Sequence, residues 1–291
     1  MIGLRIVDEV ARQDWLARLS EGIQQAARQL FAAGGPAGRA IEDLLHGTPA
    51  GHPLHPALTD IPVGAWTVAL VLDALDGLAG REDLAPGADV AVGIGLLGAL
   101  GAVSTGLADW KELDTKPLRV GLIHGSLNLG ATTLYATSWL LRRRGAREAG
   151  RGLALAGYAL VVAAAYLGGD LVYRDQIGVS HANPIWTEMT FEPALAEVEL
   201  GEGELRRVEV GGRQIVLARQ HGQVYALEDS CSHLGGPLSE GTLEDGCVQC
   251  PWHGSRFALD DGRPIEGPAA LPQPCFETRV RDGQIEVRAG Q

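Results

Sequence analysis

The 291-residue chain is poor in cysteine, in aromatic residues and in lysine, and its charge is strongly one-sided. Four cysteines are too few for a disulfide scaffold in a chain of this length, which favours metal or redox chemistry for them. A net charge of −12 lacks the basic surface that a nucleic-acid binder needs to meet phosphates. Lys111 and Lys116 are the only lysines, which we attribute to genome composition.

Apolar content and charge change along the chain, and the length favours two domains. Long apolar stretches occupy residues 1–190. Residues 191–291 carry nine basic and 17 acidic residues, in short strand-like segments separated by Gly and Asp turns. The predicted organisation is an N-terminal amphipathic surface helix with a linker over residues 1–44, a four-helix transmembrane domain over 45–182, a linker over 183–195 and a C-terminal domain over 196–291.

Four stretches of the first part are long and apolar enough to cross a bilayer, which takes about 20 residues per helix. They are Ile61–Leu78, Asp89–Leu107, Val120–Leu141 and Leu153–Val172. The alternative is a soluble bundle of buried helices, but four such runs are rare in soluble folds. Asp73 and Asp76 make the first stretch the weakest of the four.

A glycine pattern inside the second stretch, from Gly93 to Gly98, has the spacing of a dinucleotide-binding loop. No strand is predicted before it and its surroundings are apolar, which argues against that function. Gly95, Gly98 and Gly101 are instead predicted to let another helix pack closely, as small residues do in membranes.

Residues 8–31 have the periodicity of an amphipathic helix, which we expect on the membrane surface or on the bundle. Four crossings place this helix and the C-terminal domain on the same side of the membrane. Six arginines flank the helices on the far side and four basic residues on the near side, so the positive-inside rule weakly places the C-terminal domain outside the cytoplasm. The lack of paired cysteines argues the opposite way, and the sidedness stays open.

The strongest chemical pattern pairs a cysteine with a histidine twice. Cys231 and His233 are followed by sixteen residues (234–249) and then by Cys250 and His253. Each pair lies on one short loop, so two loops can converge on one metal centre, and thiolates with imidazoles suit zinc or an iron–sulfur cluster. Structural zinc sites usually group like residues together, whereas one Cys and one His per loop suits a cluster with two unlike irons.

These two loops resemble those of the Rieske family, and the resemblance spans about residues 196–288. It is carried by Cys231–Leu238 (CSHLGGPL) and Cys250–Phe257 (CPWHGSRF), and by Gly241–Leu243, Gly246–Val248, Asp261–Gly262, Gly267–Ala269 and Asp282–Ile285. It implies an all-β domain of small antiparallel sheets with one [2Fe–2S] cluster, in which Cys231 and Cys250 bind one iron and His233 and His253 the other. It also implies imidazoles that face solvent, where loss of a proton couples electron transfer to pH.

Departures from the family pattern predict a low-potential, ferredoxin-like cluster. High-potential relatives in quinol-oxidising cytochrome complexes carry an additional Cys in each loop, at the positions of Gly236 and Trp252, and a Tyr at the position of Phe257. Ser255 is retained, but Phe257 cannot donate a hydrogen bond to sulfur, so the reduced cluster is less stabilised. Trp252, Ser255 and Phe257 are therefore predicted to surround the cluster.

The two remaining cysteines, Cys247 and Cys275, match no ligand position and are predicted to be buried thiols in strands. Ring-hydroxylating oxygenases resemble this domain only at their N-terminus, and bind a catalytic iron in a later domain through two His and a carboxylate. Only 38 residues follow His253, and none of them is His. We therefore predict an electron carrier with no catalytic oxygenase domain in this chain.

The segments His52–Pro62 and Gly168–Tyr173 resemble a bacterial family of four-helix membrane domains, over about residues 45–182. This resemblance implies a fold and a membrane location but little chemistry. Ionisable groups at membrane depth are costly and often mark a pathway or a cofactor. Seven such residues fall near helix ends on the side of the C-terminal domain: His52, His55, Asp60, Asp109, His124, Asp170 and His181.

Three uses of these residues stay open. They can cap helices and bond to one another and to headgroup water, or they can line a quinone pocket that takes a proton. Alternatively, two facing histidines such as His55 and His124 can ligate a b-type haem. Asp73 and Asn128, deeper in the bundle, are predicted to be interhelical hydrogen-bond partners.

The sequence thus predicts a multi-pass protein of a bacterial cell membrane that transfers single electrons through a [2Fe–2S] cluster. Its expected partners are redox donor and acceptor proteins or a quinone, in a lipid bilayer and without nucleic acid. The alternatives are a membrane redox sensor or assembly factor that uses the cluster as a switch, and a zinc-stabilised structural domain.

Overall fold

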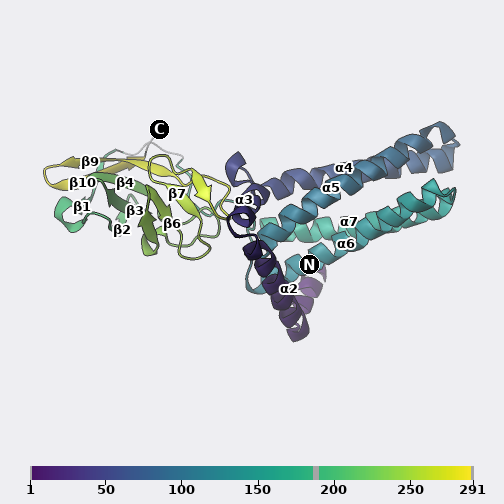
Figure 1. Cartoon of the computed structure of the whole chain (residues 1–291), viewed down its shortest axis with the longest axis horizontal. Helices are drawn as coiled ribbons and strands as arrows, with labels where there is room; N and C mark the ends of the chain where they lie inside the picture. The colour runs from purple at the N-terminus through teal and green to yellow at the C-terminus, as the bar shows by residue number, and fades with distance from the viewer. Residues whose placement is uncertain (1, 186–189, 290–291) are drawn as a thin grey trace. The chain divides into compact units, whose positions relative to one another are not determined.

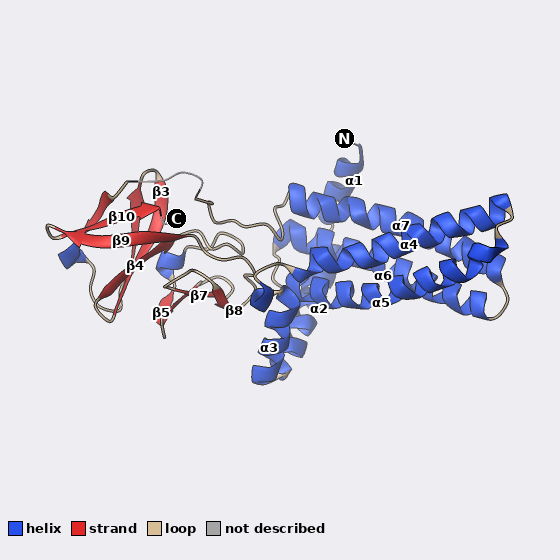
Figure 2. Ribbon diagram, turned by 90° about the horizontal axis from the view of Figure 1, so that it is seen from above, coloured by secondary structure: helices blue, strands red, loops and turns tan. Residues whose placement is uncertain are grey.

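A computed structural model describes residues 2–185 and 190–289, and the chain divides into two compact units. The helical unit comprises Met1–Gly35 and Leu54–Ile177, and the β unit comprises Pro36–Pro53 and Gly178–Gln291. The strands lie in the β unit, and the four longest helices lie in the helical unit (Figures 1 and 2). The predicted combination of a four-helix bundle with an all-β domain of small antiparallel sheets is confirmed.

Two helical hairpins form the bundle of the helical unit, and two further helices precede it (Figure 1). The helices are α1 (Ile2–Ala11), α2 (Asp14–Ala33), α4 (Leu54–Ala79), α5 (Ala85–Trp110), α6 (Thr115–Arg143) and α7 (Arg147–Tyr173). Helix α4 packs along α5, and α6 packs along α7. The turns between the paired helices contain Gly80 and Gly145, both at positive φ, a conformation that glycine adopts without strain.

Helices α4, α5 and α7 are long and apolar enough to cross a membrane. Helix α6, which contains the predicted stretch Val120–Leu141, is continuous, but within the described residues it does not reach that hydropathy. The prediction that four stretches are long and apolar enough to cross is therefore confirmed for three helices. Polar side chains lower the hydropathy of α6. Four of them are at least partly buried: His124, Asn128, Thr132 and Ser138.

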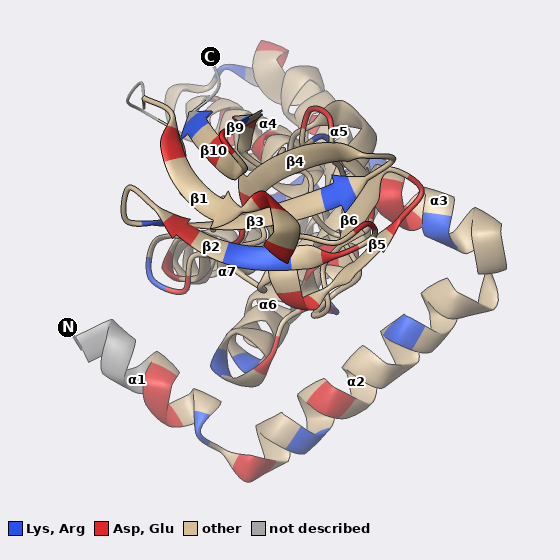
Figure 3. Cartoon of the chain, turned by 90° about the vertical axis from the view of Figure 1, so that its left-hand side faces the viewer, with Lys and Arg blue, Asp and Glu red and all other residues tan. Residues whose placement is uncertain are grey.

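The amphipathic segment predicted over residues 8–31 forms the end of α1 and most of α2, with a break at the extended residue Gln13. One face of α2 is buried, and its Gln24 Nε2 donates hydrogen bonds to the carbonyl oxygens of Lys111 (2.9 Å) and Leu113 (2.7 Å). Another face exposes large apolar side chains, among them Trp15 and Leu30. Acidic and basic residues are spaced along the same helix (Figure 3).

The two hairpins are an internal repeat. Trp66 of α4 and Tyr135 of α6 stack with ring centroids 4.1 Å apart and planes 5° apart. Trp66 and Tyr135 are 69 residues apart in the sequence, and two further contacting pairs have the same spacing. Asp73 and Arg142 form a hydrogen bond. The rings of His55 and His124 meet edge to face. Under two-fold symmetry, equivalent residues contact each other only where the axis passes between them. The hairpins α4–α5 and α6–α7 are therefore related by a pseudo-two-fold axis that passes between α4 and α6.

The second helix of each hairpin follows the same symmetry, because a glycine lies against each ring of the stacked pair. A Cβ on Gly95 of α5 would come within 2.2 Å of Trp66, and one on Gly157 of α7 within 3.1 Å of Tyr135. A Cβ on Gly98 would lie 2.5 Å from Ile61. The predicted role in close helix packing is therefore confirmed for Gly95 and Gly98, whereas a Cβ on Gly101 would make only an ordinary contact with Leu58, at 3.4 Å.

Three aspartates and three arginines from all four bundle helices form one ion network. Arg142 Nη1 donates to Asp73 Oδ1 (2.8 Å) and to Asp89 Oδ1 (3.2 Å). Arg147 Nη2 donates to Asp89 Oδ2 (2.6 Å), and Arg151 pairs with Asp76. Asp73 is thus an interhelical partner as predicted, whereas Asn128 bonds to His124 within its own helix.

Two antiparallel sheets form the β unit. The six-stranded sheet has the order β1-β10-β9-β4-β3-β2 and the four-stranded sheet the order β5-β6-β7-β8. The strands are β1 (Glu192–Ala196), β2 (Leu205–Val210), β3 (Arg213–Gln220), β4 (Gln223–Glu228), β5 (Thr242–Glu244), β6 (Cys247–Gln249), β7 (Arg256–Ala258), β8 (Pro264–Glu266), β9 (Cys275–Arg281) and β10 (Gln284–Ala289).

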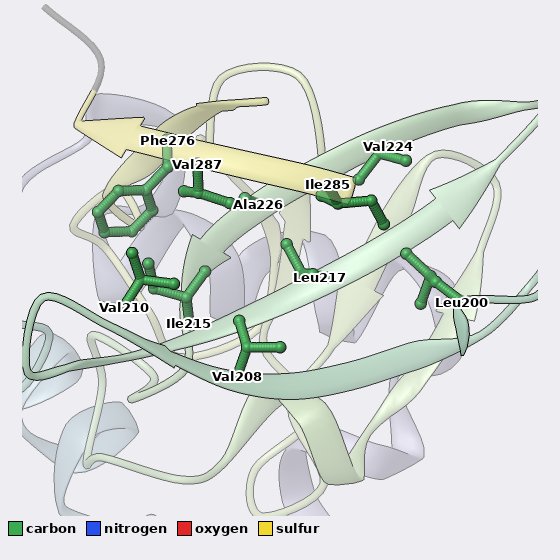
Figure 4. Packing of buried hydrophobic residues seen from close by; sticks show 10 residues of the cluster. All are labelled: Leu200, Val208, Val210, Ile215, Leu217, Val224, Ala226, Phe276, Ile285 and Val287. Carbon is green, nitrogen blue, oxygen red and sulfur yellow. The ribbon is translucent and has the colours of Figure 1, made fainter. Parts of the chain in front are cut away.

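Strand β3 lies between two hydrophobic cores, so both of its faces are buried. Ile215 and Leu217 enter the first core with residues of β2, β4, β9 and β10 (Figure 4). Val216 and Ala218 enter the second core, which contains Cys231 and Cys250 among its members. This second core is therefore the support on which the candidate site is built.

Helix α3 (Gly35–His46) and the short helix η1 (Thr48–Ala50) contribute to the β unit although they precede α4 in the chain. The Thr48 hydroxyl donates to the carbonyl oxygens of Gly267 (2.9 Å) and Ala269 (3.1 Å). The Asp43 carboxylate accepts the backbone N–H of Gly267 (2.9 Å). This segment, predicted to be partly linker, thus holds the loop that follows β8.

Candidate metal centre

Two loops of the β unit carry the four predicted metal ligands. The first loop follows β4 and contains Cys231 and His233. The second follows β6 directly, contains Cys250 and His253, and ends where β7 begins. The structure therefore brings together the residues that the sequence separates by sixteen positions.

The two loops have the same backbone hydrogen bonding. Each Cys donates its N–H to the carbonyl oxygen five residues later, from Cys231 to Gly236 (2.9 Å) and from Cys250 to Ser255 (2.8 Å). Each Cys carbonyl accepts the N–H four residues later, from Gly235 (2.8 Å) and Gly254 (3.1 Å). Both glycines have φ near +78°, at 78° and 77°, which disfavours any larger residue there. The sequence thus encodes one turn twice, and the turns differ only in the spacing of the His.

The thiols lie deeper than the imidazoles. Cys231 and Cys250 are 1% and 2% exposed, whereas His233 and His253 are half-buried. The imidazole rings meet edge to face, with centroids 4.9 Å apart and planes at 90°. The arrangement offers two sulfurs inside and two nitrogens nearer the surface.

The two thiols are close enough to share one proton. A hydrogen bond from the Cys231 thiol lowers the pKa of Cys250 and raises the pKa of Cys231. The thiolate is the form that binds a metal. Two thiolates with two imidazoles fit a [2Fe–2S] cluster that has unlike irons, and they are also a donor set that zinc accepts.

Gly236 and Trp252 occupy the two positions at which high-potential relatives carry the additional cysteines. A Cβ on Gly236 would lie 2.8 Å from Cys250 Sγ and 3.0 Å from the Trp252 ring. The missing side chain thus makes room for the indole, which is 58% exposed beside His253. Because neither position is Cys, each loop is closed by its own backbone bonds, and the two loops pack together where Gly236 meets Cys250 and Trp252.

Ser255 and Phe257 are both fully buried beside the second loop. The Ser255 hydroxyl accepts the N–H of Ala269 (3.1 Å). This leaves its proton available for another acceptor. A Cβ on Gly267 would come within 2.6 Å of Ser255 Cα, so a glycine is required for the loop after β8 to approach this closely.

Gln273 is a positioning residue that the sequence did not reveal. Its side chain is 2% exposed and donates to the carbonyl oxygens of Glu228 (2.6 Å) and Ser230 (2.7 Å). Its Oε1 accepts the N–H of Ser232 (2.9 Å). One amide thus fixes the backbone on both sides of Cys231. A motif cannot reveal such a role, because the bonds run to main-chain groups over 40 positions away.

Residues predicted for a membrane site divide between the two units. His52 and His181 belong to the β unit, where the His181 N–H donates to the Ser232 carbonyl oxygen (3.1 Å). Asp60 is exposed on α4, and Asp109 lies in the last turn of α5. Asp170 lies 3.7 Å from Arg174. His55 and His124 are the predicted residues whose rings the structure brings face to edge, at 6.5 Å between centroids.

Two family profiles match the chain. Residues 190–277 match the Rieske [2Fe-2S] domain, and residues 51–181 match a predicted membrane protein family (DUF2231). Both matches agree with the resemblances found in the sequence, and with the two kinds of unit in the fold.

Relatives of known name cover the β unit. Ferredoxin CarAc of Metapseudomonas resinovorans is 36% identical over 106 residues, which are 36% of this chain and 94% of that protein. The ferredoxin subunit of anthranilate 1,2-dioxygenase from Burkholderia cepacia is 36% identical over 34% of this chain and 93% of the subunit. A solved complex of oxygenase and ferredoxin in carbazole 1,9a-dioxygenase has a chain that is 34% identical, with a TM-score of 0.33, over 35% of this chain and 94% of that one. The chain therefore belongs to the Rieske [2Fe–2S] family.

Proposed function

We propose that the chain is a membrane-tethered one-electron carrier in which Cys231, His233, Cys250 and His253 bind the [2Fe–2S] cluster. The observation that carries this proposal is the convergence of two thiols and two imidazoles on two matching turns. Transfer of electrons through such a cluster agrees with the Rieske family and with the ferredoxin relatives. The cluster, when bound, supplies one reversible electron.

The residues of the chain control that electron in three ways. Burial of Cys231 and Cys250 excludes water from the sulfur side. Two neutral imidazoles in place of two thiolates make the centre less negative, so an added electron is easier to accept. Gln273 and the paired turn bonds hold the donors in place, so that little rearrangement accompanies the change of charge.

The partners are proposed from the relatives and from the tip of the β unit. One of the two named ferredoxins is a subunit of anthranilate 1,2-dioxygenase. We place a reductase or a membrane quinone as donor, and an oxygenase or another redox protein as acceptor. Trp252, exposed beside His253, is the kind of side chain that anchors a protein interface.

Membrane attachment is proposed from the helical unit, and a multi-pass arrangement in a bacterial cell membrane follows from it. Helices α4, α5 and α7 are apolar enough to span, and residues 51–181 match a predicted membrane protein family. Large side chains such as Leu97 and Leu100 are 72% and 64% exposed on the outside of the bundle. Lipid is the surrounding that removes the cost of exposing them to water.

The full chain, purified anaerobically in detergent, tests the cluster. We expect two irons and two acid-labile sulfides per chain, and a rhombic EPR signal after reduction by dithionite. Stoichiometric zinc without iron would instead establish a zinc-stabilised structural domain. Reduced protein that passes electrons to an added acceptor over many turnovers supports a carrier, whereas a cluster that reduces no acceptor supports a sensor.

A low midpoint potential is the second expectation, because Phe257 offers no hydrogen bond to the cluster. The range for Rieske centres is about −150 to +300 mV, and we expect a value below about 0 mV. Phe257→Tyr should raise the potential by about 60 mV, the one-electron equivalent of about 1.4 kcal/mol for a hydrogen bond to a charged group. Redox titration followed by EPR measures the shift, and Phe257→Leu is the control that should leave it unchanged.

A further inference from the structure

The pair of histidines on the pseudo-two-fold axis has the features of a second metal site, distinct from the cluster loops. We propose that His55 and His124 bind one metal between them, as two imidazoles on opposite sides of it. The metal is one that accepts this pair: the iron of a haem, or a two-coordinate copper(I) ion. The site lies within the helical unit and does not depend on the proposed electron carrier.

The hydrogen bonds of both rings determine which nitrogen is available. His55 Nδ1 lies 2.9 Å from the carbonyl oxygen of Ala102, and His124 Nδ1 lies 2.8 Å from that of Ala164. A carbonyl oxygen only accepts, so each Nδ1 carries the proton and each Nε2 keeps its lone pair. A bond from Nδ1–H to a carbonyl is the usual support of a metal-binding imidazole, since it fixes the tautomer and increases basicity.

The amide of Asn128 agrees with this assignment, because it donates to His124 Nε2 (3.1 Å). That nitrogen therefore acts as an acceptor. A metal that enters the site takes the place of this one weak neutral bond. Asn128 keeps a second acceptor, the carbonyl oxygen of His124 (3.2 Å).

The separation of the ring centroids is of the size that one atom bound by both imidazoles requires. A bond of about 2 Å from imidazole nitrogen to a metal, on each side, places the ring centroids about 6 Å apart. The centroids are 6.5 Å apart and the ring planes are at 81°. A quinone ring between the same two nitrogens would need them much farther apart, because two oxygens and a six-membered ring would separate them.

The neighbouring helices are shaped around the two rings in the same way. Gly106 lies one turn after Ala102 on α5, and Gly168 lies one turn after Ala164 on α7. A Cβ on Gly106 would come within 2.6 Å of the His55 ring, and one on Gly168 within 3.1 Å of the His124 ring. Each hairpin thus supplies one imidazole, one carbonyl and one glycine, and the two sides differ in their further partners, which are Thr105 beside His55 and Asn128 beside His124.

Two imidazoles alone complete only a few kinds of coordination. Zinc takes four protein ligands in a structural site. A haem supplies four nitrogens of its own and takes two axial imidazoles, and copper(I) accepts soft or imidazole donors in low number. The two imidazoles therefore favour a haem or a copper(I) ion as the bound group.

Titration of the detergent-purified full chain, separately with hemin and with copper(I), tests the site and distinguishes the sources. If the site takes a haem, we expect one equivalent of hemin to bind and to give the Soret band of a six-coordinate low-spin haem. If it takes copper(I), we expect the wild type to bind one more equivalent of copper than His55→Ala does. His55→Ala and His124→Ala should each weaken binding more than tenfold, whereas His52→Ala, whose exposed ring bonds to its neighbour Pro53, should bind as the wild type does. Absence of saturable binding of both probes, or equal binding by all variants, would overturn the proposal.

Two further variants identify the ligand nitrogen and separate this site from the cluster loops. Asn128→Ala frees His124 Nε2 and should bind the metal at least as tightly as the wild type. Weaker binding in that variant would show that Nε2 is not the ligand. Cys250→Ser lacks a proposed cluster ligand and should keep the bundle site, so failure of the cluster and failure of this site are distinguishable.

Discussion

Replacement of Cys250 by serine is expected to remove the [2Fe–2S] cluster and every signal that depends on it. Cys250 is 2% exposed, and the Rieske resemblance implies that it binds the same iron as Cys231. A serine hydroxyl stays protonated in such a buried place and is a poor ligand for iron in a cluster. Iron and acid-labile sulfide should fall to background, and the EPR signal of the dithionite-reduced protein should disappear.

Cys247 provides the matched control, because it is buried in β6 only three residues before Cys250. Burial raises the pKa of the Cys247 thiol, and burial raises that of Cys275 to about 11, so both are protonated near neutral pH and unreactive. Cys247→Ser and Cys275→Ser should retain the full cluster. Loss of iron from either control together with an intact Cys250→Ser cluster would show that the ligands are assigned wrongly.

Replacement of Arg142 by leucine should destabilise the helical unit by about 3 kcal/mol or more. The Arg142 side chain is fully buried and bonds to Asp73 and Asp89 on two other helices. Without Arg142, the buried Asp73 carboxylate keeps only the longer contacts to Arg147 (3.8 Å) and Arg151 (3.6 Å). Removal of one partner of a buried ion pair typically costs about 3–5 kcal/mol. Unfolding of the bundle in detergent, followed by circular dichroism as temperature or denaturant is increased, measures the change.

The double variant Asp73→Leu with Arg142→Leu should recover part of that stability, because the buried charges are removed together. Arg144→Leu, at an exposed position two residues away, should change the stability by less than about 0.5 kcal/mol. If Arg144→Leu were as destabilising as Arg142→Leu, the buried network would not be the cause.

The cluster loops were predictable because their chemistry is local in sequence. Each loop carries its own Cys, His and Gly within six residues, and the same residues close the turn in the structure. The support around them was not predictable. Gln273 bonds to backbone groups over 40 residues away, and Thr48 precedes the loop it holds by more than 200 residues. Such bonds depend on the folded path of the chain and leave no pattern in neighbouring residues.

In the bundle, hydropathy predicted the helices but not what they hold inside. Asp73 interrupts an apolar stretch and was predicted to bond to another helix, but the sequence did not identify Arg142 as its partner. Hydropathy alone cannot identify such a partner, because it counts a buried, paired charge as it counts an exposed one. The repeat is not apparent in the sequence for a related reason: two of its three contacting pairs differ in residue type, with Trp66 opposite Tyr135 and Asp73 opposite Arg142.

The pseudo-two-fold axis restricts how the two hairpins can associate. Where α4 meets α6 on the axis, one hairpin carries Asp73 and the other Arg142. A pair made of two copies of the first hairpin would bring two carboxylates together in an apolar interior, and a pair of the second would bring two guanidinium groups together, at a large cost in free energy. Neither hairpin is therefore suited to dimerise with itself, and the covalent link between them guarantees that each one meets its complement.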